Sequence, residues 1–363
     1  MKRRLLELIV CPHCREEFSL DFFSGEKSGE IKEGRLLCEG CGRLFPIIGG
    51  VPRLLPDPLK DLVLVHHGFF GKYGSQFPED YFGQMSKDSH VSIQMKKTSS
   101  SFGFEWTTFS KFYKQWEDNF KGYIRPLTPS FFGKKLGLDV GCGTGRHLYF
   151  AAQYGAEVVG IDLSEAVQVA HTNTVSFFNA HVVQADLYYL PFRTKYFDFI
   201  YSFGVLHHLP EPEAGFKELL HFLKPNGHIS IYLYNSYLRE NKIKYYLLKI
   251  ASVLRLITTR LPLKLLYWLC YPLALVIYFF VVLPYRILQF LPKGQEMAEC
   301  LPFGAYRRYP VGVLHNDLFD RFSAPIENRY TRMEVEKWFE RSGLKNVQIA
   351  ENYGWVGHGD NAG

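Results

Sequence analysis

Short apolar runs recur through the middle of the chain, separated by segments of helical composition. Four of the five runs are short enough for a buried strand, and the longest one predicts a strand that starts near Asp198. Two of the intervening segments, residues 147–156 and 214–223, predict helices. Strands that alternate with helices in this way predict an α/β fold with a largely parallel sheet. The runs span residues 136–140, 157–164, 180–184, 196–209 and 228–235.

A second patterned region lies near the end of the chain. Residues 331–343 predict a helix, and residues 345–353 predict a late strand. An α/β core built from these strands and helices does not require the segment of about residues 237–312, which is rich in apolar side chains. We therefore predict that this segment is an apolar helical insertion.

Residues 265–284 of the insertion contain no charged side chain, and a membrane span needs about 20 such residues. Pro272 and Pro284 are expected to bracket a helix of about 11 residues, which is only about 16 Å long at 1.5 Å per residue. A single crossing would also separate strands of one sheet. We therefore expect no crossing, and two interpretations stay open, a helical cap and a monotopic membrane anchor with basic flanks.

Composition indicates a folded chain and constrains its location. Of the 363 residues, 47% are hydrophobic and 21% charged, and the formal net charge of +6 does not by itself indicate nucleic acid. The first residues lack the pattern of a signal peptide. Seven cysteines are an odd number, and Cys142, Cys270 and Cys300 are scattered, which favours a reducing compartment over a disulfide framework. We expect a cytoplasmic protein, with peripheral contact to a membrane left open.

Two C-x2-C pairs near the start predict a metal site. CPHC places Cys11 and Cys14 on one tight turn, and CEGC places Cys38 and Cys41 on another. Four thiolates close a tetrahedron around zinc and leave no position for water, so the predicted zinc is structural. A redox pair or two unrelated cysteine pairs are the alternatives.

The stretch from LLELIVCPHC to CGRLFPIIGGVPRLL resembles the zinc-ribbon family that activates tRNA, ribosomal RNA and protein methyltransferases. The resemblance rests on the four cysteines and on the turn at Gly49, Gly50 and Pro52, and it implies a small ribbon over residues 1–56. The changing composition of residues 57–100 predicts a linker.

LDVGCGTGRH, residues 138–147, predicts a ligand-binding loop between a strand and a helix. Its spacing is G-x-G-x-G, whereas the dinucleotide fingerprint is G-x-G-x-x-G. Asp139 would repel a pyrophosphate but could attract an ammonium group. Asp162, at the end of the second strand, could accept hydrogen bonds from ribose hydroxyls, and Asp186 could bind the exocyclic amine of adenine. Capping or ion pairing is the alternative role for both.

In order and spacing, LDVGCGTGRH, VVGIDLS, QADLYYLPF, FDFIYSFGVLHHLPEP and ELLHFLKPNGHISIY resemble the class I S-adenosylmethionine-dependent methyltransferases. The resemblance implies a Rossmann-like, seven-stranded, mostly parallel sheet, with a core over residues 101–236 and 313–363. It also implies cofactor-binding roles for Asp139, Gly141, Gly143, Gly145, Asp162, Asp186 and Leu187.

Few residues need to act chemically in methyl transfer, because positioning supplies most of the acceleration. His207 and His208 are candidates for a general base if the acceptor is a hydroxyl, and a structural turn is the alternative. Several other side chains could cover or orient the acceptor, or could simply pack or be solvated: Phe102, Trp106, Trp116, Asp317, Asp320 and Arg329.

The sequence favours a methyltransferase with a small-molecule or lipid-like acceptor, with S-adenosylmethionine as cofactor. The first alternative is an RNA or protein methyltransferase, so nucleic acid stays a candidate partner, although no basic stripe interleaved with aromatic residues is present. The second alternative is a non-catalytic scaffold that retains the methyltransferase fold. The sequence leaves the oligomeric state open.

Overall fold

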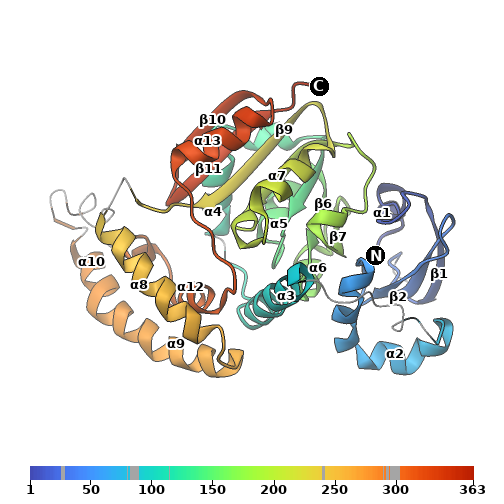
Figure 1. Ribbon diagram of the computed structural model, residues 1–363, viewed down its shortest axis with the longest axis horizontal. Helices are drawn as coiled ribbons and strands as arrows, with labels where there is room; N and C mark the ends of the chain where they lie inside the picture. Colours follow the sequence, from blue (N-terminus) through green and yellow to red (C-terminus); the bar gives the residue numbers. More distant parts are fainter. Residues whose placement is uncertain are drawn as a thin grey trace. The chain divides into compact units, whose positions relative to one another are not determined.

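The computed structural model describes residues 1–25, 29–79, 81, 90–113, 115–238, 242–288, 290–291, 294 and 303–363. They form two compact units, Met1–Asn235 with Ile326–Gly363, and Ser236–Pro325 (Figure 1). The first unit contains the sheet, and the second is helical.

One sheet runs through the first unit in the order β1-β2-β3-β4-β7-β6-β5-β8-β9-β11-β10. Strands β7, β6, β5, β8 and β9 pair in parallel, and β11 and β10 add antiparallel pairs at the far edge. The strands are β1 (Phe18–Ser24), β2 (Glu33–Cys38), β3 (Leu44–Ile48), β4 (Val51–Leu54), β5 (Leu136–Val140), β6 (Glu157–Asp162), β7 (Ala180–Ala185), β8 (Phe197–Phe203), β9 (Leu223–Tyr234), β10 (Lys345–Glu351) and β11 (Gly354–Asp360).

The α/β fold predicted from the sequence is confirmed, but the sheet is wider than the resemblance implies. Strands β5 to β11 are the seven expected strands, and the ribbon strands β1 to β4 bring the total to eleven. Strand β4 pairs in parallel with β7, with Arg53 opposite Gln184 and Leu54 opposite Ala185. The ribbon therefore extends the methyltransferase-like sheet.

Helices cover both faces of the sheet, because neighbouring strand residues point to opposite sides. Val158 faces a cluster with Phe120 of α4 and Leu148 of α5, whereas Val159 faces a cluster with Phe216 of α7 and Phe339 of α13. The helices of this unit are α1 (Arg3–Leu8), α2 (His67–Tyr73), α3 (His90–Thr108), α4 (Trp116–Ile124), α5 (Arg146–Gln153), α6 (Ala166–Thr174), α7 (Pro212–Leu220) and α13 (Arg332–Arg341), with shorter 3-10 turns η2 (Asp57–Val65), η3 (Gly74–Gln76), η4 (Pro129–Phe132), η5 (Leu187–Tyr189) and η6 (Leu206–His208).

The stretch 57–100, expected as a linker, is largely helical where the structure describes it. It contains η2, α2 and η3, and α3 runs from His90 to Thr108 across the expected boundary at residue 101. Leu59, Val63 and Met95 are buried in one small cluster, and Leu163 and Tyr188 from outside this stretch pack against it.

The ribbon shares its hydrophobic core with the rest of the first unit. Leu5, Leu8 and Phe45 of the ribbon belong to the same buried cluster as Phe192 and Phe222. Burial of large apolar side chains stabilises by about 1.5–3 kcal/mol each, so the two parts stabilise each other. The ribbon is therefore not a separable module.

Arg53 forms a buried ionic link between the ribbon and the methyltransferase-like part. Its side chain is fully buried, and Nη1 donates to Gln184 Oε1 at 2.8 Å and lies 3.3 Å from both carboxylate oxygens of Glu165. Burial lowers the pKa of Arg53, and the Glu165 carboxylate opposes that shift. The contact joins β4 to the start of α6.

The second unit consists of α8 (Lys242–Thr258), α9 (Leu263–Ile277), a π-helical turn (Tyr278–Val282), α10 (Leu283–Leu288), the 3-10 turn η8 (Gly304–Arg308) and α12 (Val311–Ser323). The expected short helix between Pro272 and Pro284 is wrong. Pro272 lies inside α9, and the helix continues from Leu263 to Leu288 over 26 residues.

Packing explains why Pro272 does not end α9. Proline removes one backbone hydrogen bond and crowds the preceding turn. Leu266, Cys270 and Ala274, spaced four residues apart, are buried on one side of the helix, and His315 Nε2 of α12 donates to Tyr267 O at 2.9 Å. These contacts hold the helix on both sides of the proline.

The buried Arg53 contact predicts a large effect on stability. Arg53→Ala should lower the free energy of unfolding of the first unit by about 3 kcal/mol, because the partly buried Glu165 carboxylate loses its guanidinium partner and keeps only the His66 imidazole and the Gln184 amide. Arg4→Ala is the matched control, since Arg4 also joins ribbon to core through Glu157, but at the surface, and should cost at most about 1 kcal/mol. Urea unfolding would compare the two, and equal losses would contradict the assigned role.

Candidate functional site

The glycine-rich loop follows β5, and its backbone amides donate hydrogen bonds to acceptors within the protein. Gly141 N and Cys142 N both donate to Ile161 O at 2.8 Å, and Gly145 N donates to Cys142 O at 2.8 Å. Gly143 N donates to a carboxylate instead. These four amides are therefore not free to bind the oxygens of a phosphate group.

The loop needs glycine at positions where the backbone turns sharply. Gly141, Gly143 and Gly145 have φ values of +77°, +52° and +77°, in the left-handed region. At Gly141 a side chain would also lie 2.2 Å from Val205. The loop can thus pass close to its neighbours only without side chains.

Asp162 holds the loop against the end of β6. One carboxylate oxygen accepts from Gly143 N at 3.0 Å, and the other accepts from Ser164 N and Ser164 Oγ at 2.8 and 2.7 Å. Burial raises the pKa of Asp162, while these donors oppose the shift. Three neutral donors thus hold the Asp162 carboxylate in place. Its remaining lone pairs can accept hydrogen bonds from a ligand.

Asp139 is a buried carboxyl group beneath the loop. It is 1% exposed, and among the residues the structure describes its Oδ2 has no hydrogen-bond partner. Burial raises the pKa of Asp139 to about 8, and the hydroxyl of Tyr201 opposes that shift. An unpartnered buried carboxyl group is costly unless a ligand completes it.

Asp186 and Leu187 follow β7 at the same edge of the sheet. Asp186 caps the 3-10 turn η5, because its Oδ1 accepts from Tyr188 N at 3.1 Å, so the capping role left open by the sequence is present. Burial raises the pKa of Asp186 to about 6. Leu187 is buried next to Gly215.

Trp106 of α3 lies beside the loop, and Trp116 at the start of α4 lies against Arg146, which follows the loop. A side chain added at Gly143 would lie 3.5 Å from the indole nitrogen of Trp106. The guanidinium group of Arg146 lies 5.2 Å from the ring centre of Trp106 and 4.7 Å from that of Trp116. The sequence indicates both tryptophans as residues that could cover the acceptor, but it does not single out Glu105, a residue of α3 that is completely buried.

His207 and His208 lie side by side after β8, and both are buried. Among the described residues, neither ring nitrogen of His207 has a hydrogen-bond partner, and its ring lies 3.9 Å from that of Tyr234. Burial holds the pKa of His207 well below its usual value, which makes it a weak base.

His208 has a defined proton arrangement. Its Nδ1 lies 2.6 Å from Ile326 O, and because a carbonyl only accepts, Nδ1 carries the hydrogen. In the neutral ring Nε2 is then the basic nitrogen. Phe102 of α3 packs edge-on against this imidazole at 4.8 Å. His208 is therefore better suited than His207 to accept a proton.

The other proposed acceptor-orienting residues are not gathered into one cluster. Asp317 belongs to the second unit, where its carboxylate accepts from Tyr306 Oη at 2.6 Å, and Asp320 lies on the same helix. Arg329 belongs to the first unit and donates to Glu327 Oε1 at 2.8 Å and to Asn235 O at 3.1 Å. Arg329 thus supports the chain where it re-enters the sheet.

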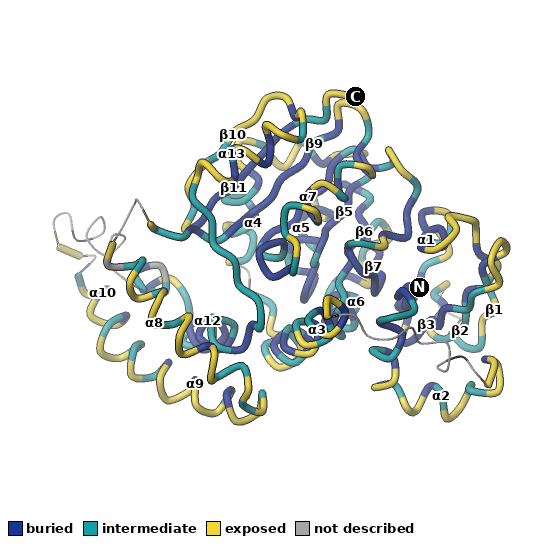
Figure 2. The backbone as a smooth tube through the Cα atoms, viewed as in Figure 1, coloured by how far each residue is buried: buried dark blue, intermediate teal, exposed yellow. Residues whose placement is uncertain are grey.

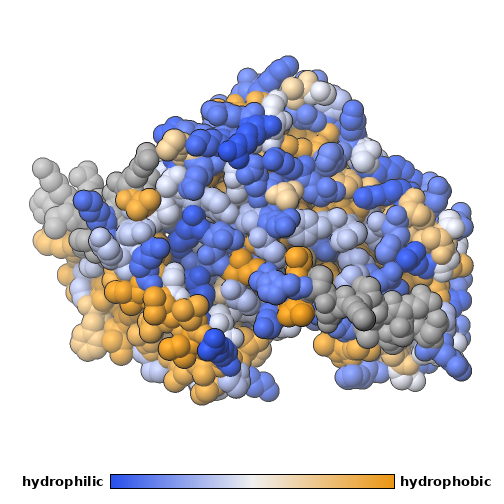
Figure 3. All heavy atoms as spheres, in the orientation of Figure 1, coloured by the Kyte–Doolittle hydropathy of each residue, from blue (hydrophilic) through white to orange (hydrophobic). Residues whose placement is uncertain are grey.

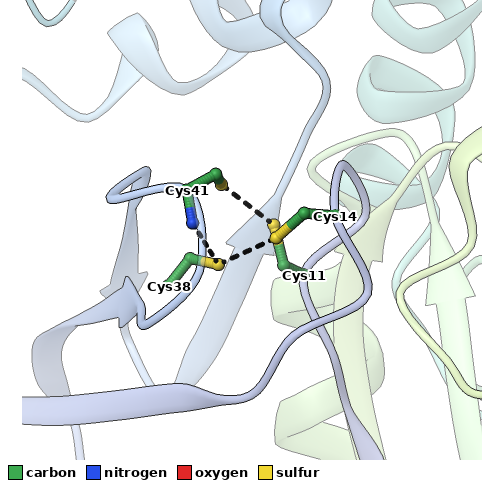
Figure 4. A group of neighbouring side chains, drawn as sticks. All are labelled: Cys11, Cys14, Cys38 and Cys41. Atoms are coloured by element: carbon green, nitrogen blue, oxygen red, sulfur yellow. Dashed lines mark hydrogen bonds between the residues drawn. The ribbon is translucent and has the colours of Figure 1, made fainter.

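The four cysteines of the two C-x2-C pairs converge in space (Figure 4). Their sulfur atoms all lie within 4.8 Å of one another, with 3.7 Å between Cys11 and Cys41 and 3.3 Å between Cys14 and Cys38. Zinc–sulfur bonds of about 2.3 Å in a tetrahedron place sulfurs about 3.8 Å apart, so the cluster has the dimensions of a zinc site.

Comparison with protein families identifies two parts of the chain. Residues 138–231 match a methyltransferase domain, and residues 2–50 match the Trm112p-like proteins. Both assignments agree with the resemblances seen in the sequence.

Curated relatives match only part of the chain. The chain is 35% identical over 115 residues to a ubiquinone biosynthesis O-methyltransferase of Idiomarina loihiensis, covering 30% of this chain and 45% of the relative. It is 30% identical over 173 residues to the chloroplastic tocopherol O-methyltransferase of Arabidopsis thaliana, covering 46% and 42%. The chain thus spans less than half the length of these relatives.

Solved structures give similar but more distant matches. A complex between the Trm112 methyltransferase activator of Haloferax volcanii and a methyltransferase is 15% identical, with a TM-score of 0.38, and covers 69% of this chain and 78% of that one. A magnesium protoporphyrin IX methyltransferase of Synechocystis is 13% identical, with a TM-score of 0.39, and covers 82% and 99%.

Proposed function

Because residues 138–231 are a methyltransferase domain and residues 2–50 a Trm112p-like segment, we propose that this chain transfers a methyl group from S-adenosylmethionine to a small-molecule or lipid-like acceptor. The ubiquinone and tocopherol O-methyltransferases among its relatives support this acceptor class.

The acidic surroundings of the glycine loop carry the proposal. Four loop amides are internally bonded, and Asp139 and Asp162 stand where a phosphate-bearing cofactor would place negative charge. S-adenosylmethionine has an ammonium group, ribose hydroxyls and no phosphate. Asp139 has an unpartnered oxygen suited to the cation, and Asp162 is fixed to accept from hydroxyls. The residues present therefore fit this cofactor.

When bound, S-adenosylmethionine supplies an electrophilic methyl group on a positively charged sulfur. The chain's own contribution is to bind and orient, with Asp162 and the glycine loop holding the ribose side and Asp186 available for the adenine amine. For a hydroxyl acceptor, His208 Nε2 would take the proton, and the carbonyl of Ile326 would keep the ring in that tautomer.

RNA remains the second candidate acceptor, because of the Trm112p-like segment. Charge argues against it, since the sequence outside residues 236–325 contains 30 Lys or Arg and 31 Asp or Glu. A nucleic-acid site would call for a net positive surface near the loop.

A methyl-label transfer assay against cell extract fractionated into lipids, small molecules, RNA and protein tests the proposed function. Label should enter the lipid or small-molecule fraction. Asp162→Asn should weaken cofactor binding by about 1–3 kcal/mol in calorimetry, because one hydroxyl acceptor is lost and the loop loosens. Asp198→Asn is the control, since Asp198 lies at the opposite end of β8, where it pairs with Lys224. Label in RNA or protein alone, or an unchanged affinity in Asp162→Asn, would contradict the proposal.

Cofactor affinity should depend on pH through Asp139. In the free chain its pKa is raised to about 8, so the carboxyl group is protonated at pH 6 and must lose its proton when a cation binds. Affinity should therefore rise by up to about tenfold per pH unit between pH 6 and 7.5, because one pKa unit corresponds to about 1.4 kcal/mol. Calorimetry in buffers of different ionisation enthalpy should detect the released proton.

Asp139→Asn provides the comparison for that measurement. The variant has no carboxyl group to titrate, so its affinity should be lower and should lack the rise below pH 7.5. If the slopes of the variant and the parent chain coincide, another group is responsible.

We also propose that Cys11, Cys14, Cys38 and Cys41 bind one structural zinc ion. The sulfur distances fit a tetrahedral site with all four positions filled by thiolate. Because the ribbon shares a core and a sheet with the methyltransferase domain, the metal would stabilise more than the ribbon.

Metal analysis of protein purified without chelator should find one zinc per chain. Cys38→Ser should lose the metal and lower the unfolding temperature of the whole first unit. His13→Ala is the matched control, because His13 lies within the first cysteine pair but outside the cluster, and it should keep the metal. A Cys38→Ser variant with normal zinc content would refute the ligand set.

A further inference from the structure

The second unit exposes many large apolar side chains on two helices. The outer sides of α8 and α9 are exposed in Figure 2, and Figure 3 shows hydrophobic side chains gathered over these helices. Trp268 is 66% exposed and Phe280 78%. We call this surface the apolar face of α8 and α9, and we include the π-helical turn that continues α9; its members include Ile250, Val253, Ile257, Trp268, Val276 and Phe280.

The apolar face is the side of these helices that does not pack on α12. Leu266, Cys270 and Ala274 turn inward from α9, while Arg255 Nε and Thr258 Oγ1 of α8 donate to the Arg321 and Phe322 carbonyls at 2.9 and 2.7 Å. Helix α9 is therefore apolar on its inner and its outer side, and α8 makes polar contacts on its inner side while exposing apolar side chains. A helix that meets water on its outer side would be polar there. A monomeric soluble protein rarely exposes an apolar patch of this extent without a partner.

The charge of this unit is strongly one-sided. Residues 236–325 contain twelve Lys or Arg and five Asp or Glu, and no acidic residue occurs between Glu240 and Glu296. Lys249 is exposed on α8, and Arg260 and Lys264 are exposed where α8 leads into α9. Cations therefore border the apolar face, and they have no acidic neighbours in that sequence.

Helix Leu263–Leu288 is long and apolar enough to cross a bilayer, and it is the one such helix in the described part of the chain. Its 26 residues would extend about 39 Å at 1.5 Å per residue. Yet β9 before the unit and β11 after it pair directly, with Tyr234 opposite Gly354. An even number of crossings is therefore required, and residues 236–325 contain no second uncharged run of about 20 residues.

We propose that the apolar face of α8 and α9 inserts into the interfacial layer of an anionic membrane without crossing it. Large apolar side chains, an exposed tryptophan and flanking cations are the combination that interfacial helices use. Each Lys or Arg near an anionic surface adds attraction, and this attraction depends on salt.

Charge favours a membrane over a second copy of the chain as the occupant. Two apolar faces packed together would bring Lys249, Arg260 and Lys264 of both copies to one interface, with no acidic residue of either face to pair with them. Anionic lipid headgroups supply the missing negative charge.

The inference does not depend on the proposed function, because it rests on the second unit alone. It would nevertheless suit an apolar acceptor. The first unit ends at Asn235 and resumes at Ile326, and the carbonyl of Ile326 orients His208.

Sedimentation of the full chain with vesicles tests the proposal. The protein should bind vesicles of phosphatidylcholine with 30% phosphatidylglycerol far better than phosphatidylcholine alone. The combined variant Lys249→Ser, Arg260→Ser and Lys264→Ser should bind the anionic vesicles about 100-fold more weakly. This estimate follows because removing one or two charges near an anionic surface weakens binding about tenfold. Trp268→Glu with Phe280→Glu should lose about tenfold or more at any salt concentration.

Phe178→Glu is the matched control, because Phe178 is 86% exposed but belongs to the first unit, and its vesicle binding should not change. Sedimentation velocity without vesicles measures self-association in parallel. A concentration-dependent dimer that Trp268→Glu abolishes, with no vesicle binding, would assign the face to a second copy and overturn the proposal. Equal binding to neutral and anionic vesicles, or cell membranes that retain the protein in alkaline carbonate, would overturn it as well.

Discussion

The parallel register of β5, β6 and β7 is the constraint on which the candidate site depends. Val140 pairs with Ile161, and Asp162 pairs with Gln184, so the three strands end at the same edge of the sheet. The loop after β5 can then bond to Ile161 and Asp162 at the end of β6. A shift of one residue in either pairing would turn Asp162 toward the opposite face of the sheet.

The same sheet explains why the ribbon and the methyltransferase domain behave as one body. Strand β7 would otherwise present an open edge, and β4 covers it. Buried Arg53 adds an ionic contact across this junction, and the apolar side chains of α1 and β3 complete a common core. The cysteine cluster therefore lies in a segment whose order affects the whole sheet, although it is not part of the candidate active site.

Charge is distributed differently over the two units. The first unit concentrates buried carboxyl groups under and beside the loop, which favours a cationic ligand and disfavours phosphate. The sequence of the second carries the chain's net positive charge, next to an apolar outer face. This separation would suit the proposed cofactor and the proposed membrane contact, which make opposite electrostatic demands.

The sequence by itself determined the positions of helices and strands that have strong local patterns. It also determined the site residues that belong to motifs of fixed spacing. The predicted run 136–140 coincides with β5, and the predicted helix at 331–343 contains α13, since apolar periodicity and capping are local properties. The four cysteines also converge as expected from their spacing. By contrast, the chemical state of Asp139 and the tautomer of His208 depend on burial and on distant partners, which no spacing reveals.

Only the tertiary structure decided the remaining features, because non-local packing outweighs local preference there. Strand β11 contains three glycines and has no strand pattern, but a side chain at Gly357 would lie 2.7 Å from Phe339, so the approach of α13 requires glycine in this strand. Pro272 should end a helix, yet packing of α9 on α12 carries the helix through it. The pairing of β4 with β7 joins residues more than 100 positions apart, and it alone makes the ribbon part of the sheet.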